Sequence, residues 1–259
     1  RHQEKRTQNQ RRRIPRGHLM SLILVNGDSF CHERHSAVDE SYEQKTWAHS
    51  LGAKNIALGG CSNDRIFHST IDYLNTNPVN VLIIGWTSWH RGWTTLSNGL
   101  NLHIGSRSAA DDNLFGHNEK DHNDWHEHRE FYYKKCYNEF LNFKNFLNYY
   151  LHLQQHCALK DIRFLNFMTF ASPTGQLEII AESANINRSS EDIKQSGIRN
   201  HVKILEDLIS RFDKKNWINK EIFFNYQNLV REKNFPFLSD GHPGIEASQY
   251  WAKVVKDNL

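Results

Sequence analysis

Short apolar runs alternate along this chain with longer segments in which apolar residues recur every three or four positions. The apolar runs predict buried strands over residues 21–26, 54–58, 79–84 and 161–167, with a short fifth strand over 221–224. The periodic segments predict helices over residues 43–51, 63–74, 130–156, 198–212 and 244–255. Strands that alternate with helices favour a mostly parallel sheet of about five strands, covered by helices on both faces as a three-layer α/β/α sandwich.

Two segments lack this alternation. Residues 1–19 are rich in arginine and poor in apolar residues, which predicts a disordered basic segment. A nucleic-acid or partner-binding arm is one interpretation. A tag, linker or upstream sequence is preferred, because Met20 directly precedes the first predicted strand. The polar stretch at about 92–129 is interpreted as an insertion in a single domain over residues 20–259.

Charge and cysteine content narrow the class of protein. The net charge is +3, from 32 basic and 29 acidic side chains, so no overall positive field points to nucleic acid as a partner. The four cysteines form no Cys-x-x-Cys pair, and no apolar run is long enough to span a membrane. These features predict a cytoplasmic protein with free thiols, and a phage or virion origin is also compatible with them. The oligomeric state stays open.

Two short motifs at opposite ends of the predicted domain carry the candidate chemistry. Gly27-Asp28-Ser29-Phe30 follows the first apolar run, and Asp240-Gly241-His242-Pro243 precedes the last helix. A serine hydroxyl becomes a useful nucleophile when a positioned histidine takes its proton. The chain order Ser, Asp, His is one of several that give a catalytic triad. Taken alone, Ser29 is better explained as a helix-capping serine in a turn, whereas the motif with Asp240 and His242 favours a catalytic role.

These motifs resemble those of the SGNH/GDSL hydrolase superfamily of serine esterases. Residues 55–63 resemble its second motif, an asparagine followed by an oxyanion-hole glycine, here Gly60. The third family motif, Gly-x-Asn-Asp, stands here as Gly85-Trp86-Thr87-Ser88, with Thr87 in place of the asparagine. In the last motif Asp240 lies two residues before His242, whereas the commonest spacing in the family is three. The resemblance covers residues 20–259 and implies a flavodoxin-like fold of the SGNH-hydrolase type.

The resemblance implies a role for each motif residue. It makes Ser29 the nucleophile, His242 the general base and Asp240 the group that orients the base. It implies that the backbone N–H groups of Ser29 and Gly60 are oxyanion-hole donors. The Thr87 hydroxyl and the Asn63 side chain are two further candidates. No metal ion or organic cofactor is needed for this chemistry.

An aromatic and basic cluster follows the third predicted strand and is the candidate substrate-binding region. Its members, with the first-motif aspartate, are Asp28, Trp86, Ser88, Trp89 and Arg91. Tryptophan faces suit sugar rings or acyl groups, and arginine suits a carboxylate or phosphate. The alternative is that these residues pack the insertion against the domain. The insertion itself is rich in histidine and aspartate, for which a solvated lid or partner-binding loop is preferred over a metal site because no HExxH pattern or cysteine pair occurs.

The sequence therefore predicts a serine esterase that cleaves a small acyl ester, with a carbohydrate ester as the preferred substrate. Acyl transfer on the same fold is one alternative. A catalytically degenerate module that binds carbohydrate or protein is the other, and the replaced asparagine of the third motif motivates it.

Overall fold

The computed structural model describes residues 22–32, 34–35, 43–44, 46–95, 101–104, 127, 130–170, 173, 175–185, 191–238 and 241–259. The interpretations of residues 1–19 and of the histidine-rich part of the insertion lie outside these ranges, as does Asp240.

The described residues contain a central sheet of four parallel strands in the order β4-β1-β5-β8. The strands are β1 (Ile23–Gly27), β4 (Lys54–Asn55), β5 (Val81–Trp86) and β8 (Arg163–Met168). Gly27 lies opposite Gly85, and Gly85 lies opposite Phe167, so three strands end at the same edge of the sheet. The predicted α/β class with a mostly parallel sheet is confirmed, and ligands of such sheets bind at this edge.

The fifth strand predicted over residues 221–224 is wrong. Phe223 has a φ of 67°, a left-handed conformation that interrupts an extended backbone. Two isolated parallel bridges replace the strand beside β8, one between Asn166 and Trp217 and one between Met168 and Asn225.

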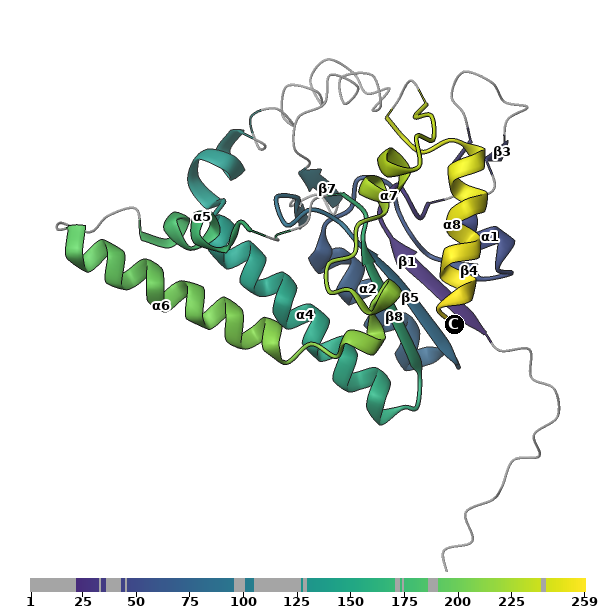
Figure 1. Ribbon diagram of the computed structural model, residues 1–259, viewed down its shortest axis with the longest axis horizontal. Coiled ribbons are helices and arrows are strands. Elements are labelled where there is room, and N and C mark those ends of the chain that lie inside the picture. Colours follow the sequence, from purple (N-terminus) through teal and green to yellow (C-terminus); the bar gives the residue numbers. More distant parts are fainter. Residues whose placement is uncertain are drawn as a thin grey trace, which may run out of the picture.

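The strands are apolar on both faces because each face is covered by helices. Along β5, Leu82 and Ile84 belong to one hydrophobic core and Ile83 to the other, as the period of two in a strand requires. The first core is closed by α2 (Asn63–Thr76) and α4 (Glu139–Leu159). The second is closed by α1 (Trp47–Ser50), α7 (Tyr226–Glu232) and α8 (Ile245–Asp257). Figure 1 shows these helices on opposite sides of the sheet.

An outer helical layer covers α4 on the side away from the sheet (Figure 1). It consists of α5 (Leu177–Glu182) and α6 (Glu191–Ser210), the latter longer than the helix predicted over residues 198–212. The described residues also form three short 3-10 turns, η3 (Ser183–Asn185), η4 (Lys214–Asn216) and η5 (Ile218–Lys220). No helix in the described part of the chain has the length and apolar character needed to cross a membrane.

The long helix predicted over residues 130–156 is divided. A π-helical turn, η2 (Tyr132–Cys136), precedes α4. Between them Asn138 adopts extended backbone angles and caps α4, its side chain accepting a hydrogen bond from the Leu141 N–H. A capping asparagine begins a new helix, which periodicity alone does not distinguish from a continuous one.

Two further predictions need correction. Most of the helix predicted over residues 43–51 is absent, because α1 is only four residues long and β3 (Glu43–Gln44) pairs with β2 (Arg34–His35). The polar stretch at 92–129 begins with an antiparallel pair, β6 (Gly92–Thr95) and β7 (Asn101–Ile104). Its remainder is outside the described ranges apart from Glu127.

Candidate active site

The turn after β1 places Ser29 at the carboxyl edge of the sheet. The Asp28 carbonyl oxygen accepts hydrogen bonds from the N–H groups of Cys31 and His32, at 2.9 and 3.0 Å, and closes a tight helical turn. The Asp28 carboxylate accepts the Phe30 N–H at 3.0 Å within the same turn. These hydrogen bonds hold the turn that carries Ser29, which is 8% exposed and therefore largely shielded from bulk water.

Two glycines at the strand ends make this turn possible. A Cβ at Gly27 would lie 2.5 Å from the Cys31 Sγ and 2.8 Å from the Gly85 carbonyl oxygen. A Cβ at Gly85 would lie 2.5 Å from the same sulfur and 2.8 Å from a ring carbon of Phe167. The Cys31 thiol therefore fills the space that two side chains would need, and the nucleophile turn sits close against the sheet.

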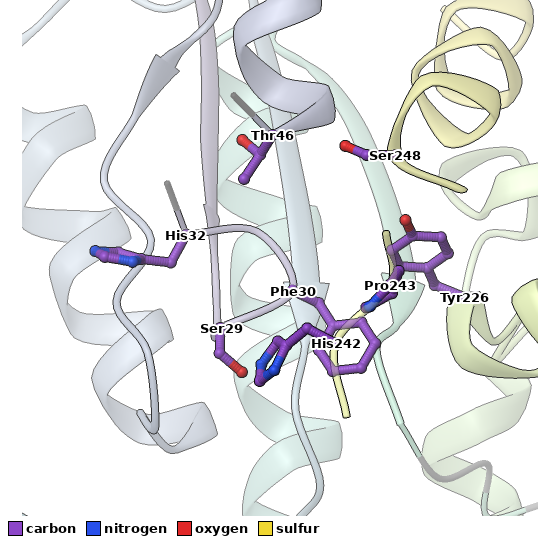
Figure 2. A pocket seen from close by; sticks show the side chains of 8 residues that line it. All are labelled: Ser29, Phe30, His32, Thr46, Tyr226, His242, Pro243 and Ser248. Atoms are coloured by element: carbon purple, nitrogen blue, oxygen red, sulfur yellow. The ribbon is translucent and has the colours of Figure 1, made fainter. Parts of the chain in front are cut away.

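His242 reaches the same edge from a turn before α8. The His242 carbonyl accepts the Leu238 N–H at 2.7 Å, and the Leu238 carbonyl accepts the Gly241 N–H at 2.8 Å. Gly241 has a φ of 78°, a conformation that glycine adopts without steric cost. The His242 ring lies 5.2 Å from the Phe30 ring, centroid to centroid. Figure 2 shows the Ser29 hydroxyl directed toward the His242 imidazole, so the structure brings together the predicted nucleophile and base.

The segment with the second motif lies beside Ser29. A Cβ at Gly59 would lie 3.7 Å from the Ser29 Cβ, and Gly60 adopts a left-handed φ of 75°. Neither the Ser29 N–H nor the Gly60 N–H donates a hydrogen bond to another described residue. Two uncommitted backbone donors near a nucleophile suit the charge that develops on an attacked carbonyl oxygen.

Asn63 and Thr87, the candidates for a third donor, are bound to each other. The Asn63 amide donates to the Thr87 carbonyl at 3.0 Å and accepts from the Thr87 N–H at 2.9 Å. This pair ties the start of α2 to the end of β5. The Thr87 hydroxyl is fully buried and has no hydrogen-bond partner among the described residues. Each side chain keeps one donor without a described acceptor, namely the second amide N–H of Asn63 and the Thr87 hydroxyl.

Replacing Asn63 with Ala is expected to lower the free energy of unfolding by about 2 kcal/mol or more, because it leaves a buried N–H and a buried carbonyl of Thr87 without partners. Urea unfolding would measure the change. Asn77→Ala at the other end of α2 is the matched control, since its side chain bonds an exposed part of the same helix. Equal losses in the two variants would contradict the bracing role of Asn63.

Asp28 and Arg91, both predicted to bind substrate, form a partly shielded ion pair behind the nucleophile turn. The Asp28 carboxylate is fully buried, accepts the Thr169 hydroxyl at 2.8 Å and lies 3.6 Å from the Arg91 Nη1. The Arg91 guanidinium lies 4.7 Å from the centre of the Phe170 ring. Asp28 is thus committed to internal contacts, whereas the Arg91 Nη1 is buried and donates no hydrogen bond among the described residues.

Trp86 and Trp89, also predicted to contact substrate, are more buried than that role requires. Trp86 is fully buried against Phe146, and its ring N–H donates to Asn166 at 2.9 Å, which leaves no face for a substrate. Trp89 is 2% exposed and packs on Phe143. Both tryptophans pack on α4, within the body of the domain, and Trp89 also lines a second pocket. The Ser88 hydroxyl accepts the His90 N–H at 3.3 Å, in the loop that carries Arg91.

A small pocket of about 290 Å³, part of it open to solvent, lies beside Ser29 and His242 (Figure 2). Its other lining residues are Phe30, His32, Thr46, Tyr226, Pro243 and Ser248. The motifs contain no signal for Thr46, Tyr226 or Ser248, which come from the starts of α1, α7 and α8. Within the described ranges no group of three or more histidine, cysteine or carboxylate side chains is arranged to hold a metal ion.

The fold and the Ser29–His242 pair define an α/β protein with a candidate nucleophile at the carboxyl edge of its parallel sheet. A scan against protein-family models and a search of curated proteins each found no match. Among solved structures the chain is similar to TesA, with 11% identity, a TM-score of 0.44, and coverage of 92% of this chain and 98% of that one. It is also similar to an acetylxylan esterase, Axe2, from Geobacillus stearothermophilus, with 8% identity, a TM-score of 0.40, and coverage of 92% and 94%. A GDSL-like lipase from Bacteroides thetaiotaomicron VPI-5482 shows 13% identity, a TM-score of 0.38, and coverage of 92% and 86%.

Proposed function

We propose that this protein is a serine esterase of the SGNH/GDSL type that cleaves a small acyl ester. The observation that carries the proposal is the meeting of Ser29 and His242, which come from opposite ends of the chain and lie together at the edge of the sheet (Figure 2). If Ser29 only capped a helix, there would be no reason for the His242 imidazole to lie beside its hydroxyl. The two backbone donors at Ser29 and Gly60 add the second element that acyl transfer requires.

The reaction begins with attack by the Ser29 oxygen on the ester carbonyl carbon, while His242 takes the hydroxyl proton. The N–H groups of Ser29 and Gly60 stabilise the negative charge that forms on the carbonyl oxygen. His242 then returns the proton to the departing alcohol, and an acyl-enzyme remains. Water, activated by the same histidine, releases the acid and restores Ser29. Asp240 is the proposed orienting group of His242.

The pocket beside Ser29 favours a short acyl group. Phe30 and Tyr226 form apolar walls, and the enclosed space is small. A long acyl chain would extend beyond these walls, so its additional methylene groups would gain little from burial. The preferred substrate is an acetyl or similarly short ester, with a carbohydrate as the alcohol.

Labelling with a fluorophosphonate tests the activated serine directly. The wild-type protein should be labelled, whereas Ser29→Ala and His242→Ala proteins of unchanged circular dichroism should not. Labelling that persists without Ser29 would exclude the mechanism. Absence of labelling in folded wild-type protein would favour the degenerate binding module, and transfer of the acyl group to an added sugar in preference to water would identify an acyltransferase.

The replacement of the family asparagine by Thr87 gives a prediction about rate. If the Thr87 hydroxyl supplies the third oxyanion donor, Thr87→Val should lower kcat about 100-fold with little change in KM. Initial rates on 4-nitrophenyl acetate would measure this. Thr76→Val, at the exposed end of α2, is the control. A Thr87→Val protein with wild-type kcat would mean that two backbone donors are sufficient.

A further inference from the structure

A second, larger pocket lies beyond the second and third motifs, between α2, α4 and the start of β6. It holds about 550 Å³ of space, part of it open to solvent. Its lining residues are Asn63, Asp64, Trp89, Arg91, Gly92, Tyr132, Asn142, Asn145 and Tyr149. We refer to it as the polar pocket, because most of these side chains end in an amide, a hydroxyl or a charged group.

The polar pocket adjoins the candidate active site through two residues. Arg91 lines the pocket and also lies 3.6 Å from the carboxylate of Asp28, the neighbour of Ser29. Asn63 lines it and holds the Thr87 backbone at the end of β5. These two contacts link the lining of the polar pocket to the nucleophile turn and to the end of β5.

The aromatic walls of the pocket are held in place. Tyr149 stacks on Phe67 with ring centres 4.8 Å apart. The Tyr132 hydroxyl accepts a hydrogen bond from the Asn142 amide at 3.1 Å. A Cβ at Gly92 would lie 2.5 Å from the Tyr132 ring, so only glycine lets this ring occupy its position. Burial raises the pKa of both Tyr132 and Tyr149 above the ordinary tyrosine value.

The chemistry of the lining indicates the class of ligand. Amide and hydroxyl groups both donate and accept hydrogen bonds, as sugar hydroxyls do. The Arg91 Nη1 is buried beside the Asp28 carboxylate, at 3.6 Å, and donates no hydrogen bond among the described residues. An acyl chain would leave these groups dehydrated and unpaired, at about 1–3 kcal/mol each. An anion would meet the Asp64 carboxylate and a cation would meet Arg91, so a neutral polyhydroxylated ligand fits both.

We propose that the polar pocket binds a neutral sugar unit of the alcohol part of the ester substrate. This assignment rests on the proposed esterase function and places the acyl group and the sugar in separate pockets. Tyr132 and Tyr149 supply ring faces, Asn142 and Asn145 supply amides, and Arg91 supplies a guanidinium group that also pairs with Asp28.

A pair of asparagine variants on α4 tests the assignment. Asn142 lines the polar pocket, whereas Asn148 lies on the same helix and does not line it. For each protein the ratio of kcat/KM on 6-O-acetylglucose, which keeps its other hydroxyls free, to kcat/KM on 4-nitrophenyl acetate is measured. Asn142→Leu should lower this ratio at least tenfold, and Asn148→Leu should leave it within twofold of wild type. An unchanged ratio in Asn142→Leu would overturn the subsite.

A direct binding experiment tests the sugar subsite independently of the proposed esterase activity. Maltose and cellobiose are titrated by NMR into Ser29→Ala protein, with and without Asn142→Leu or Asn148→Leu. Saturable binding that Asn142→Leu weakens at least fivefold, and Asn148→Leu does not, supports the subsite whether or not the protein hydrolyses esters. Absence of saturable binding by Ser29→Ala protein would show a pocket that holds only water and would overturn the assignment. Hydrolysis that survives in Ser29→Ala would instead refute the esterase mechanism.

Discussion

Replacing Ser29 with Ala is expected to lower kcat on 4-nitrophenyl acetate by roughly 10³-fold or more, and His242→Ala should cost a similar factor. Both changes remove a partner of the same proton transfer, so the double variant should be scarcely slower than either single variant. Initial rates and a burst-phase measurement on the purified proteins would establish this. Both side chains lie at the edge of the sheet and neither supports the core, so the variants should remain folded.

Ser210→Ala is the matched control for this experiment. Ser210 ends α6, and its hydroxyl donates to the Asp207 carbonyl at 2.7 Å on an exposed surface far from the motifs in the sequence. Its rate should equal that of the wild type. Additive losses in the Ser29 and His242 double variant would indicate that the two side chains act independently, contrary to a shared proton transfer.

Gly85→Ala is expected to lower the free energy of unfolding by about 3 kcal/mol. The new methyl group would lie 2.5 Å from the Cys31 Sγ, 2.8 Å from a Phe167 ring carbon and 3.0 Å from a Thr169 methyl carbon. All three neighbours are fully buried, so none has open space into which to move. Urea unfolding would measure the loss, and the displaced nucleophile turn should also lower activity in the folded fraction.

Gly52→Ala separates crowding from backbone preference. Gly52 has a left-handed φ of 63°, and a Cβ there would meet no atom within 4 Å. Alanine should therefore cost about 1 kcal/mol, from its backbone conformation alone. If Gly85→Ala is no more destabilising than Gly52→Ala, the close packing of Cys31 between the two strand ends does not constrain this site.

The sequence predicts the sheet and its main helices well because their signals are local. The run Val81–Trp86 is apolar throughout, and only a strand covered on both faces makes that pattern stable. The break before α4 and the missing fifth strand depend on single residues, the cap at Asn138 and the left-handed Phe223. Periodicity averages over such positions, so it does not detect them.

The candidate site likewise has features that local motifs predict and features that depend on contacts between distant segments. Ser29, Gly60 and His242 belong to motifs whose order along the chain indicates a shared edge of the sheet, and the structure places Ser29 and His242 together. The hydrogen bonds between Asn63 and Thr87, and the approach of Arg91 to Asp28, join segments that only the strand order brings together. Tryptophans after a strand predicted a sugar platform, but whether a ring faces a cleft or the core depends on the helix packed against it.

The two hydrophobic cores divide the candidate site between them. Phe30 and the start of α8, which hold the nucleophile turn and the histidine turn, belong to the core shared with α1 and α7. Cys61, Trp89 and Phe143, which support the Gly60 segment and the polar pocket, belong to the core shared with α2 and α4. Amino-acid changes that accumulate in one layer therefore leave the packing of the other largely intact. If the polar pocket binds the alcohol as proposed, substitutions in α2 and α4 would change the alcohol specificity while the opposite layer keeps Ser29 and His242 in place.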